Sequence, residues 1–343
     1  MTGALGLVGA AAVRRLTAMG LEVVGIDNDM RRTFFGDAAS NAATHDALKQ
    51  CKGFRLVEAD IRDTDGITKV FRRHLGAVQA VIHAAAQPSH DWAATDPTTD
   101  FAINATATLA LLEACREHTP DARFLCVSTN KVYGDHPNHL PLAEGATRMD
   151  LDPSHPFHDR GIDESMSIDQ TRHSLFGVSK TAADLMVQEY GDRFGLATSV
   201  FRAGCITGED HHGAKAHGFL SYLCRVAREG GTYEVIGHDG KQVRDNLHAD
   251  DLADAFARVI AAPPSSGVYN IGGGRKASCS ILEALDIASE ILARPVSRTF
   301  TKAPRYGDHI WWISDTSRFQ NTYPGWSPSH TAKDLITRLL ADV

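Results

Sequence analysis

The sequence has no apolar run that approaches the about 20 residues needed to span a bilayer. It also lacks a basic start followed by an apolar stretch, the pattern of a secretory signal. With a net charge of -7 and a pI near 6.2, it has no basic excess of the kind that nucleic-acid-binding proteins carry. These absences predict a cytoplasmic protein that binds neither membranes nor nucleic acid.

Cysteine pairs are also absent, because no two cysteines stand in C-x-x-C spacing. The six cysteines are Cys51, Cys115, Cys126, Cys205, Cys224 and Cys279. Most lie among apolar residues, which favours a reducing compartment without disulfides. The stretch "EDHHGAKAHG" (209–218) is rich in histidine, but its glycines favour a loop that shapes a pocket, so no metal is expected.

What the first half does contain is an alternation of short apolar runs with amphipathic stretches. The runs expected to form buried strands are 21–27, 54–60, 80–86 and 122–129. The segments between them have helical spacing of apolar residues. Repeated strand–helix units of this kind predict an α/β protein with a parallel, doubly wound sheet.

Beyond about residue 205 the pattern changes, with more glycine and histidine and shorter strands. We therefore predict a cofactor-binding domain over 1–204, with 246–274 returning to it. The predicted substrate lobe, a smaller α/β unit, comprises 205–245 and 275–343. The stretch 135–170 is rich in proline, histidine and aspartate and is expected to be a long loop.

The start of the chain has the pattern of a phosphate-binding turn. Gly3, Gly6 and Gly9 precede a helical stretch, and glycines allow a pyrophosphate to approach the backbone at a helix N-terminus. Asp27 ends the next strand, where a carboxylate accepts the ribose hydroxyls of NAD and repels the 2′-phosphate of NADP. Asp60 and Ile61 end the following strand and are expected near the adenine.

Only Met1 and Thr2 precede this turn, although a full apolar strand is expected there. A central strand of the sheet is therefore predicted to be missing. Our hypothesis is that the natural start lies upstream, and a chain that truly begins at Met1 is predicted to be poorly stable.

Several motifs together resemble the extended short-chain dehydrogenase/reductase family, in its nucleotide-sugar epimerase/dehydratase branch, over nearly the whole chain. The motifs are "TGALGLVG", "GID", "EADIRD", "HAAAQ", "STNKVYGD", "HSLFGVSK" and "GKQVRDNLHADD". Within the branch, "STNKVYGD", "GIDES" and "GKQVRDNLH" look most like the CDP-paratose (CDP-tyvelose) 2-epimerase group. The resemblance implies a Rossmann-type domain that binds NAD, a nucleotide-diphosphate sugar as substrate, and a homodimer formed through paired helices.

The resemblance also implies binding residues. Those expected at NAD are Gly3, Gly6, Leu7, Val8, Gly9, Asp27, Asn28, Asp60, Ile61, Ala84, Ala85, Ala86, Asn104 and Lys180. Those expected at the substrate are Gln87, Lys131, Arg244, Arg305 and Asp308. Arginine suits a diphosphate because its guanidinium binds two oxygens at once. A surface ion pair is the alternative for Arg244 and Asp245.

In the family, a Tyr-x-x-x-Lys pair and a Ser or Thr act on the reacting hydroxyl. Here Lys180 and Thr129 (with Ser128 beside it) match, but Phe176 stands at the tyrosine position. Removing a hydride from an alcohol carbon requires a base for the hydroxyl proton. A phenyl ring cannot exchange a proton, so the missing phenol is the central question posed by this sequence.

Four explanations fit the sequence. Another group is the base, from Glu164, His173, Cys205 or Lys180 itself, although each taken alone has an ordinary structural role. A second explanation is that the enzyme is slow and works with weak base assistance. A third is that the protein binds its ligands without turnover. A fourth is that Phe176 is an engineered replacement that traps substrate. We favour a natural substitute base.

The favoured function is a nucleotide-sugar epimerase of carbohydrate metabolism that inverts a carbon through a transient keto-sugar and regenerates NAD in place. The alternatives are a dehydratase or reductase of the same substrates, or a catalytically silent nucleotide-sugar and NAD binder.

Overall fold

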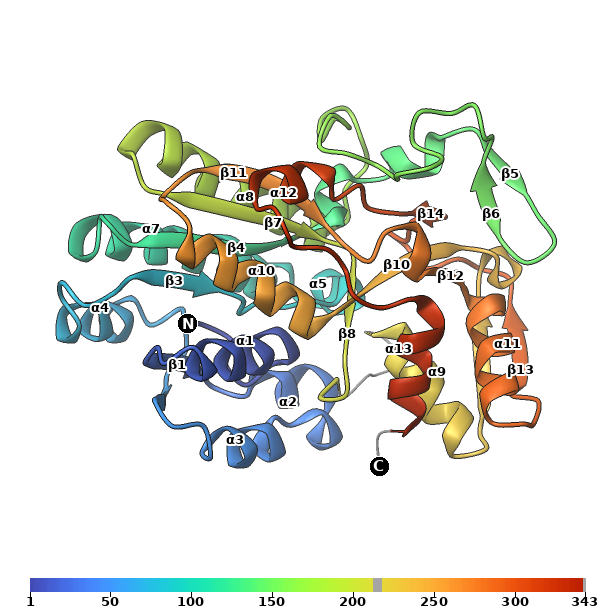
Figure 1. The fold of residues 1–343 in the computed structure, drawn as a ribbon, viewed down its shortest axis with the longest axis horizontal. Coiled ribbons are helices and arrows are strands. Elements are labelled where there is room, and N and C mark those ends of the chain that lie inside the picture. Colours follow the sequence, from blue (N-terminus) through green and yellow to red (C-terminus); the bar gives the residue numbers. More distant parts are fainter. Residues whose placement is uncertain (212–217, 342–343) are drawn as a thin grey trace. The chain divides into compact units, whose positions relative to one another are not determined.

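The computed structural model describes residues 1–211 and 218–341 and divides them into two compact units (Figure 1). The first unit comprises 1–132, 175–202 and 252–269. The second comprises 133–174, 203–251 and 270–343. Residues 133–174 thus group with the second unit, whereas the sequence-based boundaries placed them in the first.

The first unit alternates strands and helices. Its elements are α1 (Leu7–Ala18), β1 (Val23–Asp27), α2 (Met30–Phe35), α3 (Ala42–Leu48), β2 (Phe54–Glu58), α4 (Thr64–Arg73), β3 (Ala80–His83), α5 (His90–Thr95), α6 (Pro97–Phe101), a π-helical turn (Ala102–Thr106), α7 (Ala107–His118), β4 (Arg123–Thr129) and α8 (Leu175–Phe194). Three more elements meet or cross a unit boundary: β7 (Thr198–Ala203), α10 (Ala249–Ala261) and β11 (Gly267–Ile271).

Strands pair in the orders β1-β2 and β11-β7-β4-β3, with β1 parallel to β2 and β3 parallel to β4. Met1 and Thr2 connect the two groups, because Thr2 bridges Ile26 on one side and His83 on the other. Figure 1 shows the N-terminus beside β1 and β3. These two residues occupy the place in the sheet where the sequence analysis expected a full strand.

Apolar spacing explains the helices that cover this sheet. In α4, the Asp63 side chain caps the first turn by accepting from the Gly66 N–H at 3.0 Å. Ile67 and Phe71 stand four residues apart on one face and are buried in the core of the unit. The alternation read from the sequence thus corresponds to a sheet with helices packed against it.

The second unit is built around β10 (Val243–His248). The other strands are β5 (Leu142–Glu144), β6 (Met149–Leu151), β8 (Cys205–Thr207), β9 (Thr232–Ile236), β12 (Ser278–Ser280), β13 (Ser297–Thr301) and β14 (Trp311–Trp312). The helices are α9 (Phe219–Arg228), α11 (Ile281–Ile291), α12 (Ser317–Thr322) and α13 (Ala332–Ala341). β10 pairs with β8 and β14 in parallel and with β12 antiparallel.

The expected long loop at 135–170 contains an antiparallel hairpin, β5–β6. The Met149 N–H donates to the Lys241 carbonyl at 2.8 Å, and Arg275 forms two 2.9 Å bonds with Asp150. These contacts explain why the segment groups with the second unit. They join residues far apart in the sequence, so local pattern could not reveal them.

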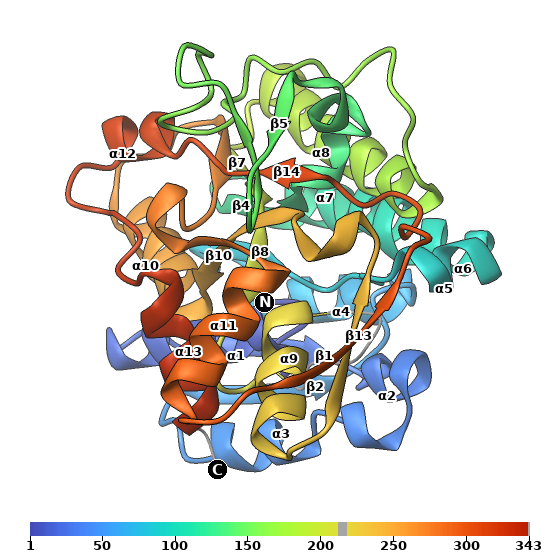
Figure 2. The same cartoon turned by 90° about the vertical axis from the view of Figure 1, so that its right-hand side faces the viewer.

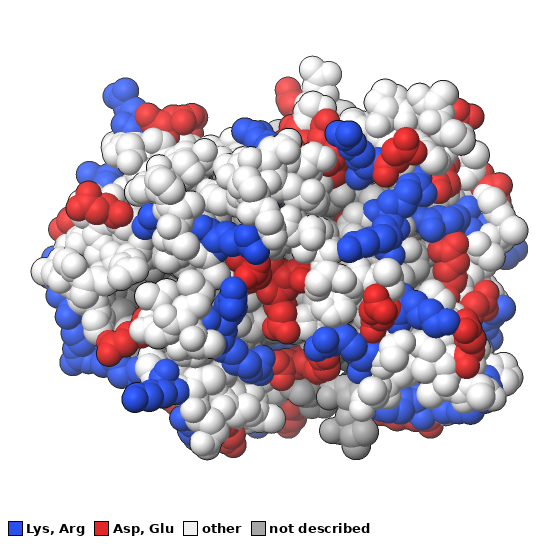
Figure 3. All heavy atoms as spheres, in the orientation of Figure 1, with Lys and Arg blue, Asp and Glu red and all other residues white. Residues whose placement is uncertain are grey.

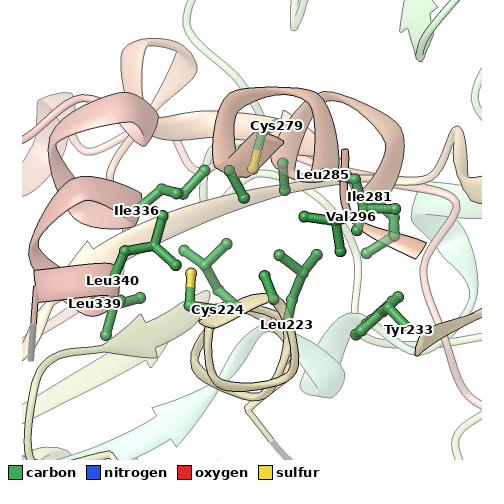
Figure 4. Packing of buried hydrophobic residues seen from close by; sticks show 14 of the residues in the cluster. Leu223, Cys224, Tyr233, Cys279, Ile281, Leu285, Val296, Ile336, Leu339 and Leu340 are labelled. Carbon is green, nitrogen blue, oxygen red and sulfur yellow. The ribbon is translucent and has the colours of Figure 1, made fainter. Parts of the chain in front are cut away.

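Helices α9, α11 and α13 lie side by side and enclose the core of the second unit (Figure 2). Figure 4 shows Leu223 and Cys224 of α9 in one cluster with Leu285 of α11 and with Ile336, Leu339 and Leu340 of α13. On the face shown in Figure 3, acidic and basic side chains are interspersed. None of the helices described is both long and apolar enough to cross a membrane.

Candidate active site

Two glycines of the turn before α1 have no room for a side chain, and the third has room for one. Gly3 has φ +67°, and a Cβ there would lie 2.6 Å from the Ala85 nitrogen. A Cβ on Gly9 would overlap the Gly3 carbonyl oxygen. Gly6 is different: its Cβ would meet only the Gly3 oxygen, at 3.5 Å. Gly6 is also the N-cap of α1 and has no side-chain cap, so a ligand anion can take that place.

Asp27 is held at the end of β1 by two backbone N–H groups. Leu5 and Asp29 each donate to its carboxylate at 2.9 Å. Burial raises the pKa of Asp27, and these bonds partly oppose that shift. Asp60 accepts from Arg62 at 2.6 Å and from Asn28 at 3.0 Å, and the Arg62 bond lowers its pKa. Both acids therefore have fixed orientations in the unit that holds the glycine turn.

Gln87 and Asn104 belong to a buried hydrogen-bond network. The Asn104 amide oxygen accepts from the Gln87 N–H at 2.9 Å, and its nitrogen donates to Asp100 at 3.0 Å. The Gln87 amide nitrogen donates to Asp100 at 2.7 Å. Asn104 lies in the π-helical turn, a distortion frequent at functional sites. Both side chains have internal partners here, and their expected roles at NAD and substrate remain predictions.

Of the three alanines that follow β3, Ala85 packs against the hydrophobic cluster that contains Ile61. The Ala84 and Ala85 N–H groups donate to the Thr2 carbonyl and hydroxyl, each at 3.3 Å. Ile61 is buried in the core, and Ala86 is half-buried. Small side chains at 84–86 keep the backbone accessible beside the glycine turn.

Ser128 and Thr129 have different roles at the end of β4. The Ser128 hydroxyl donates to Asp184 at 2.6 Å, and Asp184 is also bound to Arg202 at 2.8 Å. Thr129 is half-buried and makes only long bonds, 3.3 Å from the Lys131 N–H and 3.4 Å to Asn130. The geometry favours Thr129 as the hydroxyl that meets a ligand.

Phe176 and Lys180 both lie on α8, one turn apart. Lys180 is buried, and its Nζ donates to the Val127 carbonyl at 2.8 Å. Burial lowers the pKa of this ammonium group. The Phe176 ring is almost fully buried and meets His90 edge-on, with ring centroids 5.0 Å apart. Helix α8 begins at Leu175 and so carries both residues.

In the second unit, Arg244 extends from β10 and its Nη2 lies 3.7 Å from Asp308 Oδ1. Its Nη1 donates to the Val243 carbonyl at 2.9 Å. Arg305 and Asp308 both act electrostatically on Tyr233, whose pKa is raised chiefly by burial. Three expected substrate residues thus gather in one unit: Arg244, Arg305 and Asp308.

Arg244 and Asp245 do not form the surface ion pair considered as an alternative. Asp245 is fully buried and accepts from the Ser314 and Gly274 N–H groups at 3.0 and 3.2 Å. A Cβ on Gly204 would lie 2.6 Å from its Oδ1, so glycine makes room for this carboxylate. Burial raises the pKa of Asp245 to about 6.

This pKa predicts a pH-dependent stability. Because the folded pKa exceeds the ordinary 3.8, the folded chain binds more protons between pH 3.8 and 6, and the free energy of unfolding falls as pH rises through that window. The loss amounts to about 3 kcal/mol. In Asp245→Asn the slope measured by urea unfolding from pH 4 to 7 should be smaller by the contribution of this carboxyl. As a control, Asp286→Asn, on the exposed face of α11, should keep the wild-type slope. An unchanged slope in Asp245→Asn would contradict the prediction.

The remaining base candidates lie in the second unit. Glu164 Oε1 accepts from the Asn270 N–H at 2.6 Å, and burial raises its pKa. It lines a polar pocket of about 640 Å³. His173 Nε2 lies 3.0 Å from the Ile168 carbonyl oxygen, which fits a structural role. Cys205 is half-buried in β8, opposite Asn246 of β10.

Sequence reasoning missed several polar residues that hold the first-unit site. They are His90, Asp100, Ser179, Asp184 and Arg202. Local signals near them are two helix caps, Ser89 and Asp96, the second followed by a proline. Among the histidine-rich residues 209–218, His212 and His217 lie outside the described residues, and the described part of the chain holds no group of metal-ligating side chains.

Comparisons with known proteins identify the family of this chain. The model of the NAD dependent epimerase/dehydratase family matches residues 1–272. CDP-paratose 2-epimerase of Salmonella typhi is 30% identical, covering 99% of this chain and 97% of its own. UDP-glucose 4-epimerase of Thermus thermophilus, solved with NAD, has TM-score 0.78 and 24% identity, covering 99% and 97%. A Tyr-to-Phe mutant of UDP-glucuronic acid 4-epimerase from Bacillus cereus has TM-score 0.78 and 24% identity, with the same coverage of 99% and 97%.

Proposed function

The chain belongs to the NAD dependent epimerase/dehydratase family, and from this premise we propose that it is a nucleotide-sugar epimerase with Phe176 in place of the usual catalytic tyrosine. The observation that carries the proposal is the retention of the other catalytic side chains. Thr129 and Lys180 lie in one unit with the open glycine turn, and Arg244 is kept in the second. A protein without turnover has no need of this set.

The cofactor of the family is NAD, and the first unit fits it. The open position at Gly6 and the uncapped start of α1 would hold the pyrophosphate, and Asp27 would accept the ribose hydroxyls. Bound NAD supplies a two-electron oxidation of the sugar carbon and, once reduced, its reversal. The side chains of this protein must then bind the sugar, exclude water and move the hydroxyl proton.

Loss of the phenol is compatible with binding. The Tyr-to-Phe mutant of the Bacillus cereus enzyme was crystallised with NAD and a UDP-fluoro-sugar, so in that protein a phenyl ring does not prevent the complex. By analogy, Phe176 leaves room for cofactor and substrate here. The proton transfer that the phenol performs must then be supplied by another group.

On the substrate side, we assign the diphosphate to Arg244 and Arg305. Arg244 is almost fully buried, and the carboxylate of Asp308 lies at the long distance of 3.7 Å from its guanidinium. A diphosphate would form a stronger, bidentate contact with this guanidinium. In the first unit, Thr129 is half-buried and weakly bonded within the protein, and we propose it as the hydroxyl that contacts the sugar.

The test is turnover of a panel of CDP-, UDP-, dTDP- and GDP-sugars without added cofactor, followed by NMR in D2O. An epimerase should invert one carbon and keep the hydrogen on it, because the hydrogen leaves and returns as hydride. Deuterium at the inverted carbon would contradict the proposed chemistry. A deoxy-keto product would indicate a dehydratase, and net consumption of reduced cofactor a reductase.

The second candidate, a silent binder, makes a different prediction. It would bind NAD and a nucleotide sugar tightly and convert none of the panel. Arg244→Gln serves in both cases, because it should weaken binding of the nucleotide diphosphate by about tenfold or more if Arg244 holds the phosphates. Isothermal titration with the free nucleoside diphosphates measures this without any need for turnover.

We further propose a homodimer formed through α7 and α8. Large apolar side chains are exposed on these helices: Leu109, Leu175, Val178, Leu185 and Phe194. Leu175, Val178 and Leu185 follow helical spacing on one face of α8. An exposed apolar stripe on a folded unit is typical of a protein interface.

Leu185→Arg should therefore convert the dimer to a monomer. A charge placed at an interface hot spot costs about 2 kcal/mol or more, so the dimer dissociation constant should rise by about 30-fold or more. Light scattering after size exclusion measures the mass. Leu75→Arg, at another exposed apolar position of the first unit, should leave the mass unchanged, whereas a dimeric Leu185→Arg protein would reject this interface.

A further inference from the structure

His90 is the titratable side chain that packs against the ring at the tyrosine position. The His90 and Phe176 centroids are 5.0 Å apart, with the planes inclined at 66°. His90 is the first residue of α5 and is half-buried, so its ring is partly accessible to a ligand. Phe176 in turn lies one helical turn before Lys180.

The two rings are held together by the buried polar network. The Gln87 amide nitrogen donates to the Ser89 carbonyl at 2.9 Å, which fixes the residue that precedes His90. Ser179 Oγ lies 2.6 Å from Asp100 Oδ2 and 3.1 Å from the Phe176 carbonyl oxygen. Because Gln87 also donates to Asp100, one network positions both backbones. The histidine is thus pre-organised beside Phe176.

Four other titratable groups described in the first unit are buried. His83 is fully buried between two hydroxyls, and its pKa is lowered to about 3. Burial raises the pKa of Cys126 to about 11. Asp100 is buried with three hydrogen-bonded neighbours, and Asp184 is paired with Arg202. His90 differs from all of these in being partly exposed.

We propose that His90 performs the proton transfer of the absent phenol; this inference rests on the proposed epimerase function. As the sugar hydroxyl loses its O–H proton to the imidazole, the carbon hydrogen leaves as hydride to NAD, and a carbonyl forms. In the return step the same hydride adds to the other face of the carbonyl carbon, and the imidazolium gives its proton back to the oxygen. Atoms and electrons balance, with no net oxidation.

The first test is a cycle of His90→Gln, Phe176→Tyr and the double variant. His90→Gln should fold normally and lower kcat by about 100- to 10,000-fold with little change in KM. Adding Phe176→Tyr to that variant, or adding free imidazole to His90→Ala, should recover turnover. His45→Gln, on α3 of the same unit, should behave as wild type.

The second test does not depend on turnover. In protein labelled with ¹³C at histidine Cε1, the resonance missing from His90→Gln identifies His90, and it should shift when a nucleotide sugar joins the NAD-loaded protein. Turnover by His90→Gln within about threefold of wild type overturns the inference. So does a loss that neither tyrosine nor imidazole recovers, or an unmoved resonance. If wild type converts no nucleotide sugar, the proposed function fails instead, and the resonance shift still reports on His90.

Discussion

Gly6→Ala should fold like the wild type but lose NAD, whereas Gly9→Ala should yield little folded protein. A Cβ at Gly9 would overlap the Gly3 carbonyl oxygen, which is backbone and cannot move aside. We expect a loss of about 4 kcal/mol or more in the free energy of unfolding. At Gly6 the backbone has φ -72°, which alanine adopts freely, and the nearest atom is 3.5 Å away. The cost there should be about 1 kcal/mol or less.

The methyl group of Gly6→Ala would stand where we propose that the pyrophosphate approaches the start of α1. Losing one or two charge-assisted hydrogen bonds should weaken NAD binding by about tenfold to more than 100-fold. Thermal unfolding and the NAD released on denaturation measure the two effects separately. Gly20→Ala is the matched control for a glycine with nothing near its Cβ, although its φ of +82° adds some strain. Full NAD content in Gly6→Ala would reject the turn as the phosphate site.

The sequence could predict the elements that depend on local residue patterns, namely the glycine turn and the strands of the first unit. Gly3 and Gly9 marked the turn because each has almost no room for a side chain, and Asp27 marked the strand end that follows it. The strands expected at 21–27, 54–60, 80–86 and 122–129 are present, each shorter at one end. Buried runs and amphipathic stretches report burial directly, so these elements follow from the sequence.

Long-range contacts were beyond that reasoning. Residues 133–174 group with the second unit because Asp150 binds Arg275 and Met149 binds Lys241, partners far away in the sequence. Ser128 stands beside Thr129 in the motif, but its hydroxyl donates to Asp184 in the structure. A side chain's availability depends on its neighbours in space, which a motif does not specify.

The same limit explains why the group that substitutes for the missing phenol could not be identified from the sequence. The candidates weighed from the sequence were chosen for closeness in sequence or in motif, as with His173 and Glu164. The structure gives His173 a backbone partner and places His90, which lies far before Phe176 in the chain, against its ring. The candidate for moving the proton therefore emerged from packing in the folded structure and not from residue spacing in the sequence.

Lys180→Met should abolish turnover and leave the fold intact. The ammonium is buried on α8 and donates to the Val127 carbonyl at 2.8 Å, next in the chain to Ser128 and Thr129. A fixed positive charge in such a site stabilises the negative charge that grows on the reacting oxygen as its proton leaves. Its removal should lower kcat by about 1,000-fold. Lys69→Met, at an exposed position of α4, should retain wild-type turnover.

Lys180→Met should lose activity without losing conformational stability. Burial lowers the pKa of Lys180 below its ordinary 10.5, so between the two values the unfolded chain binds more protons. The wild type should therefore gain stability as pH rises toward 10.5, and Lys180→Met should lack that gain. Because methionine fills the space without a charge to desolvate, the variant should be at least as stable as wild type near neutral pH, apart from the lost bond to Val127. Urea unfolding at neutral and alkaline pH measures this, with Lys69→Met as reference. If Lys180→Met unfolds at neutral pH, its loss of turnover reflects the fold, and the buried ammonium is a structural support rather than part of the chemistry.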